Sequence, residues 1–162
     1  MPDLICDTST IQYLYQLELL HILPALAERV IVPPSVLEEL AAGRASGVSL
    51  PDLSAQEWVT VRRPTGETAL PLVTDLGSGE AAVLMLALES REAVAVLDDA
   101  FARRIAETLG LRHTGTLGLL LDAKQAGLVA AVRPLLDRLQ ALRFRLAAHT
   151  RTAVLKLAGE EP

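Results

Sequence analysis

The chain has 162 residues, enough for a domain with its own core, and 51% of them are hydrophobic while only 3% are aromatic. The formal net charge of −5 argues against a general nucleic-acid binder, because such proteins carry a basic face. The single cysteine, Cys6, excludes an intrachain disulfide and a cysteine-based zinc site. No apolar run reaches the roughly 20 residues that span a bilayer, and the first strand begins too early for a secretory signal. We therefore expect a cytoplasmic protein without a membrane segment.

Short apolar runs predict four β-strands in this chain, and a fifth is a candidate. In chain order, the predicted strands are Leu4–Cys6, Val30–Val32, Trp58–Val61 and Ala93–Leu97, with Arg112–His113 as the candidate. Phe144–Leu146 is predicted as an edge strand. The loop over residues 44–56 is predicted to be irregular.

Helical spacing of apolar residues predicts helices after these strands. The first contains Leu14, Leu17, Leu20 and Leu23 and breaks or restarts at Pro24, and the second follows Pro33–Pro34 and ends near Gly43. The later ones are Ala81–Glu89, Ala100–Leu109, a helix that ends at Lys124, Val132–Leu142 and Arg151–Leu157.

Strands that alternate with helices predict a parallel sheet covered on both faces. We therefore expect an α/β fold, a three-layer α/β/α sandwich with a central, mainly parallel sheet of four to five strands. The sequence contains no internal repeat and no linker that would separate two domains. Residues 1–162 are therefore expected to form a single domain, in which 141–162 is a C-terminal helical extension.

Four carboxylates, Asp7, Glu39, Glu80 and Asp99, lie where a predicted strand ends or near the start of a predicted helix. Open α/β sheets place their sites at the carboxyl ends of the strands, so these acids are expected to meet there. Such a pocket carries too much negative charge to stand alone, and divalent cations stabilise it. Mg²⁺ or Mn²⁺ ions held by carboxylates commonly catalyse the hydrolysis of phosphodiesters. The residues thus favour a small metal-dependent nuclease.

Each acid also has a purely structural interpretation. Asp7 could cap the next helix, although Thr8, Ser9 and Thr10 could do so instead. Glu38 and Glu39 could both be solvated surface acids. Glu80 stands in the first turn of its helix, where the helix dipole favours an acid. Of the pair Asp98–Asp99, one could cap the following helix while the other reaches a metal.

Four stretches in this order and spacing resemble the PIN-domain family, in particular an uncharacterised prokaryotic branch of it. They are Ile5–Ser9, Val32–Leu40, Leu76–Ala82 and Leu97–Ala106, and the similarity continues through Thr114–Gly118 and Ala123–Leu128. The resemblance covers about residues 3–140. It implies a magnesium- or manganese-dependent ribonuclease with one or two divalent cations, similar to the toxin halves of bacterial toxin–antitoxin pairs.

By motif, the resemblance implies that Asp7, Glu39, Glu80 and Asp99 are the catalytic and metal-binding acids. Asp99 matches the family's acid better than Asp98 does, because in the family this acid is followed at a fixed distance by a helix with the sequence Arg-Ile-Ala, which is found here at Arg104–Ala106. Asp98 and a hydroxyl of Thr8 or Ser9 would support the metal site. The chain departs from the family pattern at Glu80, where many active toxins have an aspartate.

The resemblance and the charges together suggest partners. RNA is the expected substrate, and the arginines that could grip its phosphates are Arg62, Arg63, Arg103 and Arg104. Arg103 and Arg104 could also pair with Asp99 along their helix. An antitoxin protein and a second copy of the chain are further candidate partners. The three histidines, His21, His113 and His149, are interpreted as structural or surface residues.

Two alternatives stay open at this point. One is a catalytically degenerate PIN-like protein that binds a protein partner, which the departure at Glu80 favours. The other is a phosphatase of the haloacid-dehalogenase type, which also has an aspartate after its first strand. That family requires a second acid two residues later, where this chain has Ser9.

Overall fold

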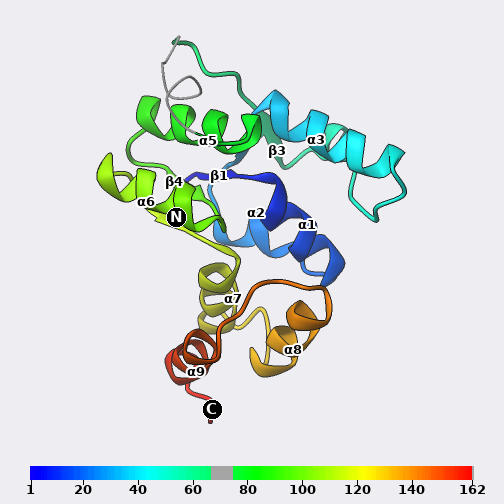
Figure 1. Cartoon of the computed structure of the whole chain (residues 1–162), viewed down its shortest axis with the longest axis vertical. Coiled ribbons are helices and arrows are strands. Elements are labelled where there is room, and N and C mark those ends of the chain that lie inside the picture. The colour runs from blue at the N-terminus through cyan, green and yellow to red at the C-terminus, as the bar shows by residue number, and fades with distance from the viewer. Residues whose placement is uncertain (67–74, 162) are drawn as a thin grey trace.

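The centre of the fold is a parallel sheet of five strands in the order β3-β2-β1-β4-β5. The computed structural model describes residues 1–66 and 75–161, and Figure 1 shows the strands between layers of helices. The strand bounds are β1 Leu4–Cys6, β2 Val30–Val32, β3 Val59–Val61, β4 Val94–Val96 and β5 His113–Thr114. The expected α/β fold with a parallel sheet is confirmed, and the candidate fifth strand is present with a shift of one residue.

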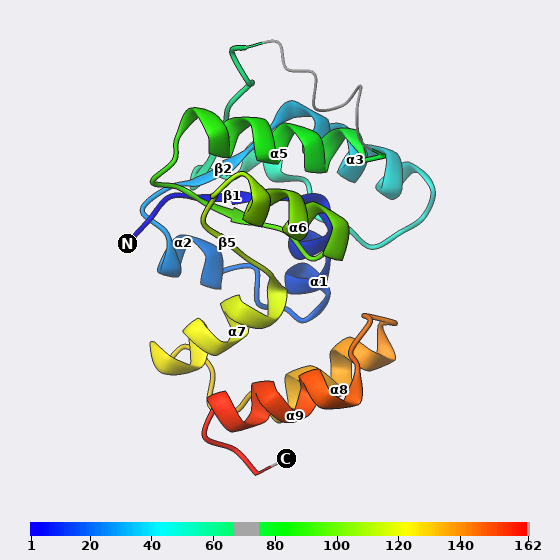
Figure 2. The same cartoon turned by 60° about the vertical axis from the view of Figure 1, so that its left-hand side comes forward.

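Helices cover both faces of this sheet (Figures 1 and 2). Their bounds are α1 Thr8–Gln16, α2 Ile22–Leu26, α3 Pro34–Ala45, η1 Leu53–Ala55 (a short 3₁₀ helix), α5 Ser78–Glu89, α6 Ala100–Thr108, α7 Thr116–Gln125, α8 Arg133–Ala141 and α9 Ala148–Leu157. Helices α5 and α6 pack on one face, whereas α1, α2 and α7 pack on the other. Among the described helices, none is long and apolar enough to cross a membrane.

The strands bury residues on both sides, as a sheet between two layers requires. Because side chains alternate along a strand, Ile5, Ile31 and Ala95 belong to the core beneath α5 and α6. Leu4 and Cys6 face the opposite core, which extends into the C-terminal helices. All five of these side chains are at most 4% exposed. The aliphatic runs that predicted the strands therefore form the middle layer of the molecule.

Two expectations about the first helices were wrong in detail. The leucine spacing continued through Leu23, but α1 ends at Gln16 and α2 starts at Ile22. The interruption lies at Glu18, which has a left-handed φ of 61°, and Pro24 is accommodated in the first turn of α2. Helix α3 does not stop at Gly43 either. Leu50 packs where a side chain at position 43 would stand, so this glycine permits a close contact instead of ending the helix.

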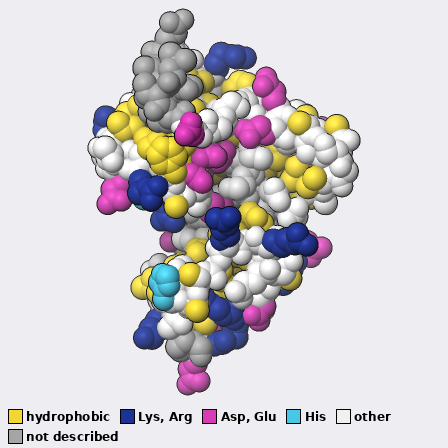
Figure 3. Space-filling view, viewed as in Figure 1, with side chains coloured by type: hydrophobic (Ala, Val, Ile, Leu, Met, Phe, Trp, Pro, Cys, Tyr) yellow, Lys and Arg dark blue, Asp and Glu magenta, His cyan; other side chains and the backbone are white. Residues whose placement is uncertain are grey.

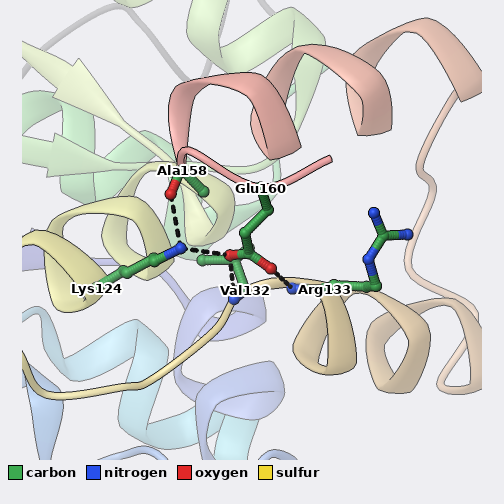
Figure 4. A network of polar contacts seen from close by, with 5 residues as sticks. All are labelled: Lys124, Val132, Arg133, Ala158 and Glu160. Carbon is green, nitrogen blue, oxygen red and sulfur yellow. Dashed lines mark hydrogen bonds and ion pairs between the residues drawn. The ribbon is translucent and has the colours of Figure 1, made fainter. Parts of the chain in front are cut away.

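The C-terminal helices α7, α8 and α9 form a unit next to α1 and α2 (Figure 2). Glu160 binds this unit together, since it accepts hydrogen bonds from Lys124 Nζ (2.9 Å) and from the backbone N–H groups of Val132 and Arg133 (Figure 4). The expected edge strand at Phe144–Leu146 was wrong, because these residues form an irregular connection between α8 and α9. Phe144 packs edge-on against Tyr13 of α1, with ring centroids 5.0 Å apart.

Candidate active site

The acids converge at the carboxyl edge of the sheet, where the strand order reverses. Strands β1 and β4 are parallel neighbours, with Cys6 in register with Val96. Asp7 directly follows β1, and Asp98 and Asp99 follow β4, so two segments far apart in sequence end side by side. Crevices of this kind are the usual position of ligand sites in open α/β sheets.

A pocket of about 460 Å³ at this edge is lined by all four expected acids and by Asp98. Figure 3 shows acidic side chains gathered in the middle of this face. A larger hollow, of about 860 Å³, lies around the N-terminus at the opposite edge of the sheet. That hollow is lined by three acids and three arginines, so its charges balance. The carboxylate pocket is therefore the candidate site.

Gly79 brings two of these acids over one spot. A side-chain carbon at position 79 would overlap the carboxylate of Glu39 and lie 3.0 Å from Asp7 Oδ1. Glu39 extends from the solvent-exposed side of α3, and Asp7 is only 6% exposed. The absence of a side chain at Gly79 thus lets Glu39 of α3 approach Asp7, which follows β1. Sequence reasoning passed over Gly79, although the Gly-Ser-Gly stretch was its signal.

Burial and mutual repulsion raise the pKa of two acids in this pocket, Asp7 and Glu80. The pKa of Asp7 is raised to about 7, chiefly by burial and further by the charges of Glu80, Glu39 and Asp98, while the Thr8 backbone N–H opposes the shift. Burial also raises the pKa of Glu80, with help from Asp99 and Glu39. None of these acids forms an ion pair with the described residues. The lining of the pocket therefore holds an excess of acids, five carboxyl side chains against two arginines.

Asp98 and Asp99 have different surroundings. Asp98 accepts hydrogen bonds from Ser9 Oγ (3.1 Å), Thr10 Oγ1 (3.3 Å) and both the N–H and hydroxyl of Thr116 (each 2.7 Å). Asp98 thus links the ends of β4, α1 and α7. Asp99 is the N-cap of α6, where its Oδ2 accepts from Ala102 N at 2.9 Å.

The hydroxyl groups beside the acids are arranged unequally. Ser9 contacts Asp98, whereas Thr8 Oγ1 is buried and has no hydrogen-bond partner among the described residues. Asp7 occupies the N-cap position of α1, yet its side chain makes no capping hydrogen bond. Its carboxylate therefore does not cap the start of α1. Thr10 and Thr116 were missed by sequence reasoning, because only the folded chain brings them to Asp98.

The arginines at the pocket are not the ones the sequence suggested. The pocket lining includes Arg143 and Arg145 but none of the four expected arginines. Of those four, Arg104 lies over the ring of Phe101, 5.9 Å from its centroid, and Arg63 lines a separate hollow beside α3 and α5. Arg62 follows β3, where its N–H donates to Val32 O.

The donor chemistry of the pocket fits a hard divalent cation. Oxygen ligands from carboxylates suit Mg²⁺ and Mn²⁺. In the described ranges, no three His, Cys, Asp or Glu side chains converge closely enough to hold one ion together. Mg²⁺ does not require that arrangement, because it retains several waters and is usually held by one or two carboxylates plus substrate phosphates. None of the three histidines lines the pocket.

Comparison with models of known protein families gives a match. A family model described as a PIN domain matches residues 3–160. The match extends 20 residues beyond residue 140, where the similarity seen in the sequence ended, and it includes the C-terminal helices. No curated protein matches the chain.

Proposed function

This chain belongs to the PIN-domain family, and from that premise we propose that it is a divalent-metal-dependent ribonuclease that hydrolyses RNA phosphodiesters. PIN domains are nuclease-type folds. The observation that carries the proposal is the single pocket lined by Asp7, Glu39, Glu80, Asp98 and Asp99, in which the pKa values of Asp7 and Glu80 are raised. Carboxylates that repel one another in this way gain the most from a bound cation.

Each acid has a proposed role in this reaction. Asp7 and Asp99 would hold one Mg²⁺ or Mn²⁺ ion, and Glu39 and Glu80 would complete its surroundings, with room for a second ion beside the substrate. When bound, such cations activate water and neutralise charge on the phosphate. Asp98 fixes the end of β4 through Ser9 and Thr116, so the neighbouring Asp99 is held in place. Thr8 and Ser9 support the site from α1.

Cation binding by this pocket is expected to be coupled to the release of a proton. With a pKa of about 7, the carboxyl group of Asp7 is partly protonated at neutral pH. A cation must displace that proton. Affinity for Mn²⁺ should therefore increase between pH 6 and pH 8, as Asp7 becomes ionised.

Further parts of the proposal rest on the family resemblance. We propose that the chain is the toxin component of a toxin–antitoxin pair, with an antitoxin protein and a second copy of the chain as partners, and that residues 1–162 form one domain. A cytoplasmic location suits the free, buried thiol of Cys6, because thiols stay reduced there. Light scattering of the purified chain, alone and with a protein encoded beside it, tests the partners.

A catalytically degenerate, partner-binding PIN protein is the second candidate, because Glu80 stands where many active toxins have an aspartate. Cleavage of labelled RNA and of DNA with the same base sequence, in Mn²⁺ and in EDTA, separates the two. The proposal predicts Mn²⁺-dependent cutting of RNA that Glu39→Gln abolishes. Glu38→Gln is the matched control, since Glu38 is the adjacent acid on α3 and does not line the pocket. Cation binding without cleavage would favour the degenerate protein.

A further inference from the structure

The connection between α8 and α9 forms one wall of the acidic pocket. Arg143, Phe144 and Arg145 all line it, together with Asp7 and Glu80. In Figure 3, which has the same view as Figure 1, Lys and Arg side chains lie directly below the acids, along the segment that joins α8 to α9. The site therefore has an acidic wall from the sheet edge and a basic wall from the C-terminal unit.

Neither arginine side chain is paired with another group among the described residues. Both are exposed, and within the described residues neither guanidinium group forms an ion pair or donates a hydrogen bond. Arg138 and Arg151 of the same unit differ, since Arg138 donates to Leu17 O and Arg151 pairs with Asp137. Free guanidinium groups beside a nuclease pocket have the geometry that recognises phosphate, because two parallel N–H groups match two of its oxygens.

The segment is held in a fixed position. Phe144, between the two arginines, packs against Tyr13, which also lines the pocket. The backbone N–H groups of Arg143 and Phe144 donate to Gln140 O and Leu139 O at the end of α8. Arg138 ties α8 to the C-terminal end of α1 through Leu17 O at 3.3 Å. The arginines are thus presented to the pocket by packed elements.

The backbone at Arg143 carries a cost that the neighbouring helices avoid. Arg143 is the second residue after α8 and has a left-handed φ of 69°. Glycine occupies this position after α3, α6, α7 and α9, with φ between 70° and 88°. Among the described helices, Glu18 after α1 is the other non-glycine residue that has a left-handed φ at this position. A residue with a side chain is disfavoured at such φ values, so an arginine at this position is unfavourable for the fold alone.

We propose that Arg143 and Arg145 bind phosphates of the RNA strand beside the bond to be cut, so that the C-terminal unit completes the substrate site. This inference rests on the proposed ribonuclease function and adds to it which residues hold the strand. It also accounts for a chain with a net charge of −5 binding a polyanion, because the positive charge is needed only at the pocket.

Binding of a labelled single-stranded RNA in Mn²⁺-free buffer, measured against salt concentration, tests the inference. Each phosphate contact contributes about 0.7 to the slope of log affinity against log salt. Arg143→Gly and Arg145→Gln should each weaken binding and reduce that slope by roughly 0.7. Lys156→Gln is the matched control, because it removes one positive charge from the exposed side of α9 and should leave the slope unchanged.

Arg143→Gly provides a second readout that a structural role would not produce. The glycine relieves the left-handed backbone, so the melting temperature should rise by about 2 °C while RNA binding weakens. In cleavage, both variants should raise KM with little change in kcat, since they remove binding and not chemistry. Mn²⁺ affinity should stay equal or increase, because the pocket becomes more negative.

The outcomes separate this inference from the proposed function. If the native protein binds and cuts RNA but both arginine variants behave like Lys156→Gln, the inference is overturned and the nuclease remains. If Arg143→Gly lowers the melting temperature together with RNA binding, the residue is structural and the inference fails. If the native protein neither binds nor cuts RNA, both proposals fail.

Discussion

Glu160→Gln should destabilise the C-terminal unit by about 2 kcal/mol at pH 7. Glu160 accepts from Lys124 Nζ at 2.9 Å and from the N–H groups of Val132 and Arg133 at 2.7 and 3.1 Å. Hydrogen bonds to a charged group contribute about 1.5–3 kcal/mol. Glutamine loses the charge and turns an N–H₂ toward a donor. Because the Glu160 side chain is 15% exposed, water compensates part of the loss. The predicted loss of unfolding free energy therefore stays near the lower end of the range of about 1.5–3 kcal/mol.

The loss of stability caused by Glu160→Gln should depend on pH in a defined direction. Hydrogen bonds from Val132 and Lys124 lower the pKa of Glu160 from 4.5 to about 2. A carboxylate with a lowered pKa stabilises the fold above pH 4.5, and that stability is lost as the pH falls toward 2. The difference in unfolding free energy between native protein and Glu160→Gln should therefore be largest at pH 5–7 and shrink below pH 4. Urea unfolding across this range measures it.

Glu161→Gln is the control for this experiment, since Glu161 is adjacent and exposed, and its substitution should change stability by less than about 0.5 kcal/mol. A Glu160→Gln difference as small as the control at pH 7 would refute the role of Glu160. A difference that stays constant from pH 7 to pH 3 would show that the ionised carboxylate is not its source.

Three further predictions concern the acidic pocket. In EDTA, Asp7→Asn should raise stability at pH 8 by about 2–4 kcal/mol, because a carboxyl group whose pKa is raised from 3.8 to about 7 costs stability progressively between these two pH values and in full above them; thermal melting that shows no gain at pH 8 contradicts this. Gly79→Ala should lower Mn²⁺ affinity roughly tenfold by displacing Glu39, which calorimetric titration measures. Asp98→Asn should cost about 2 kcal/mol in urea unfolding, since its N–H₂ would face the donors of Thr116; unchanged stability would argue against that network.

Most of the sheet could be predicted because its strands are short aliphatic runs with few alternatives. A residue within a few positions of the end of such a strand, like Asp7 or Asp99, is placed at the carboxyl edge by the chain alone. Glu39 and Glu80 were harder to place, because each lies on a helix and reaches the pocket only through helix packing. The spacing within α3 could not show that Gly79 of α5 leaves room for Glu39.

The basic wall of the pocket could not be predicted, and the reason is physical. Phe144 alternates with charged neighbours, a pattern that also describes an edge strand, and nothing local distinguishes the two. The contact between Phe144 and Tyr13 joins residues more than 100 positions apart, so only tertiary packing brings Arg143 and Arg145 to Asp7. The break after α1 was missed for a similar reason, because the leucine spacing continues across Glu18 although the backbone does not.

Asp99→Asn is the most direct probe of the central claim, that the acidic pocket is a metal-dependent ribonuclease site. Asparagine caps a helix as well as aspartate, so the variant should keep the capping bond to Ala102 and melt within a few degrees of the native protein. The measurement is cleavage of labelled structured RNAs by both proteins in Mn²⁺, Mg²⁺ and EDTA. Metal-dependent cutting by the native protein that is lost in the folded Asp99→Asn variant is the predicted result. Cutting that persists in the variant or in EDTA would contradict it.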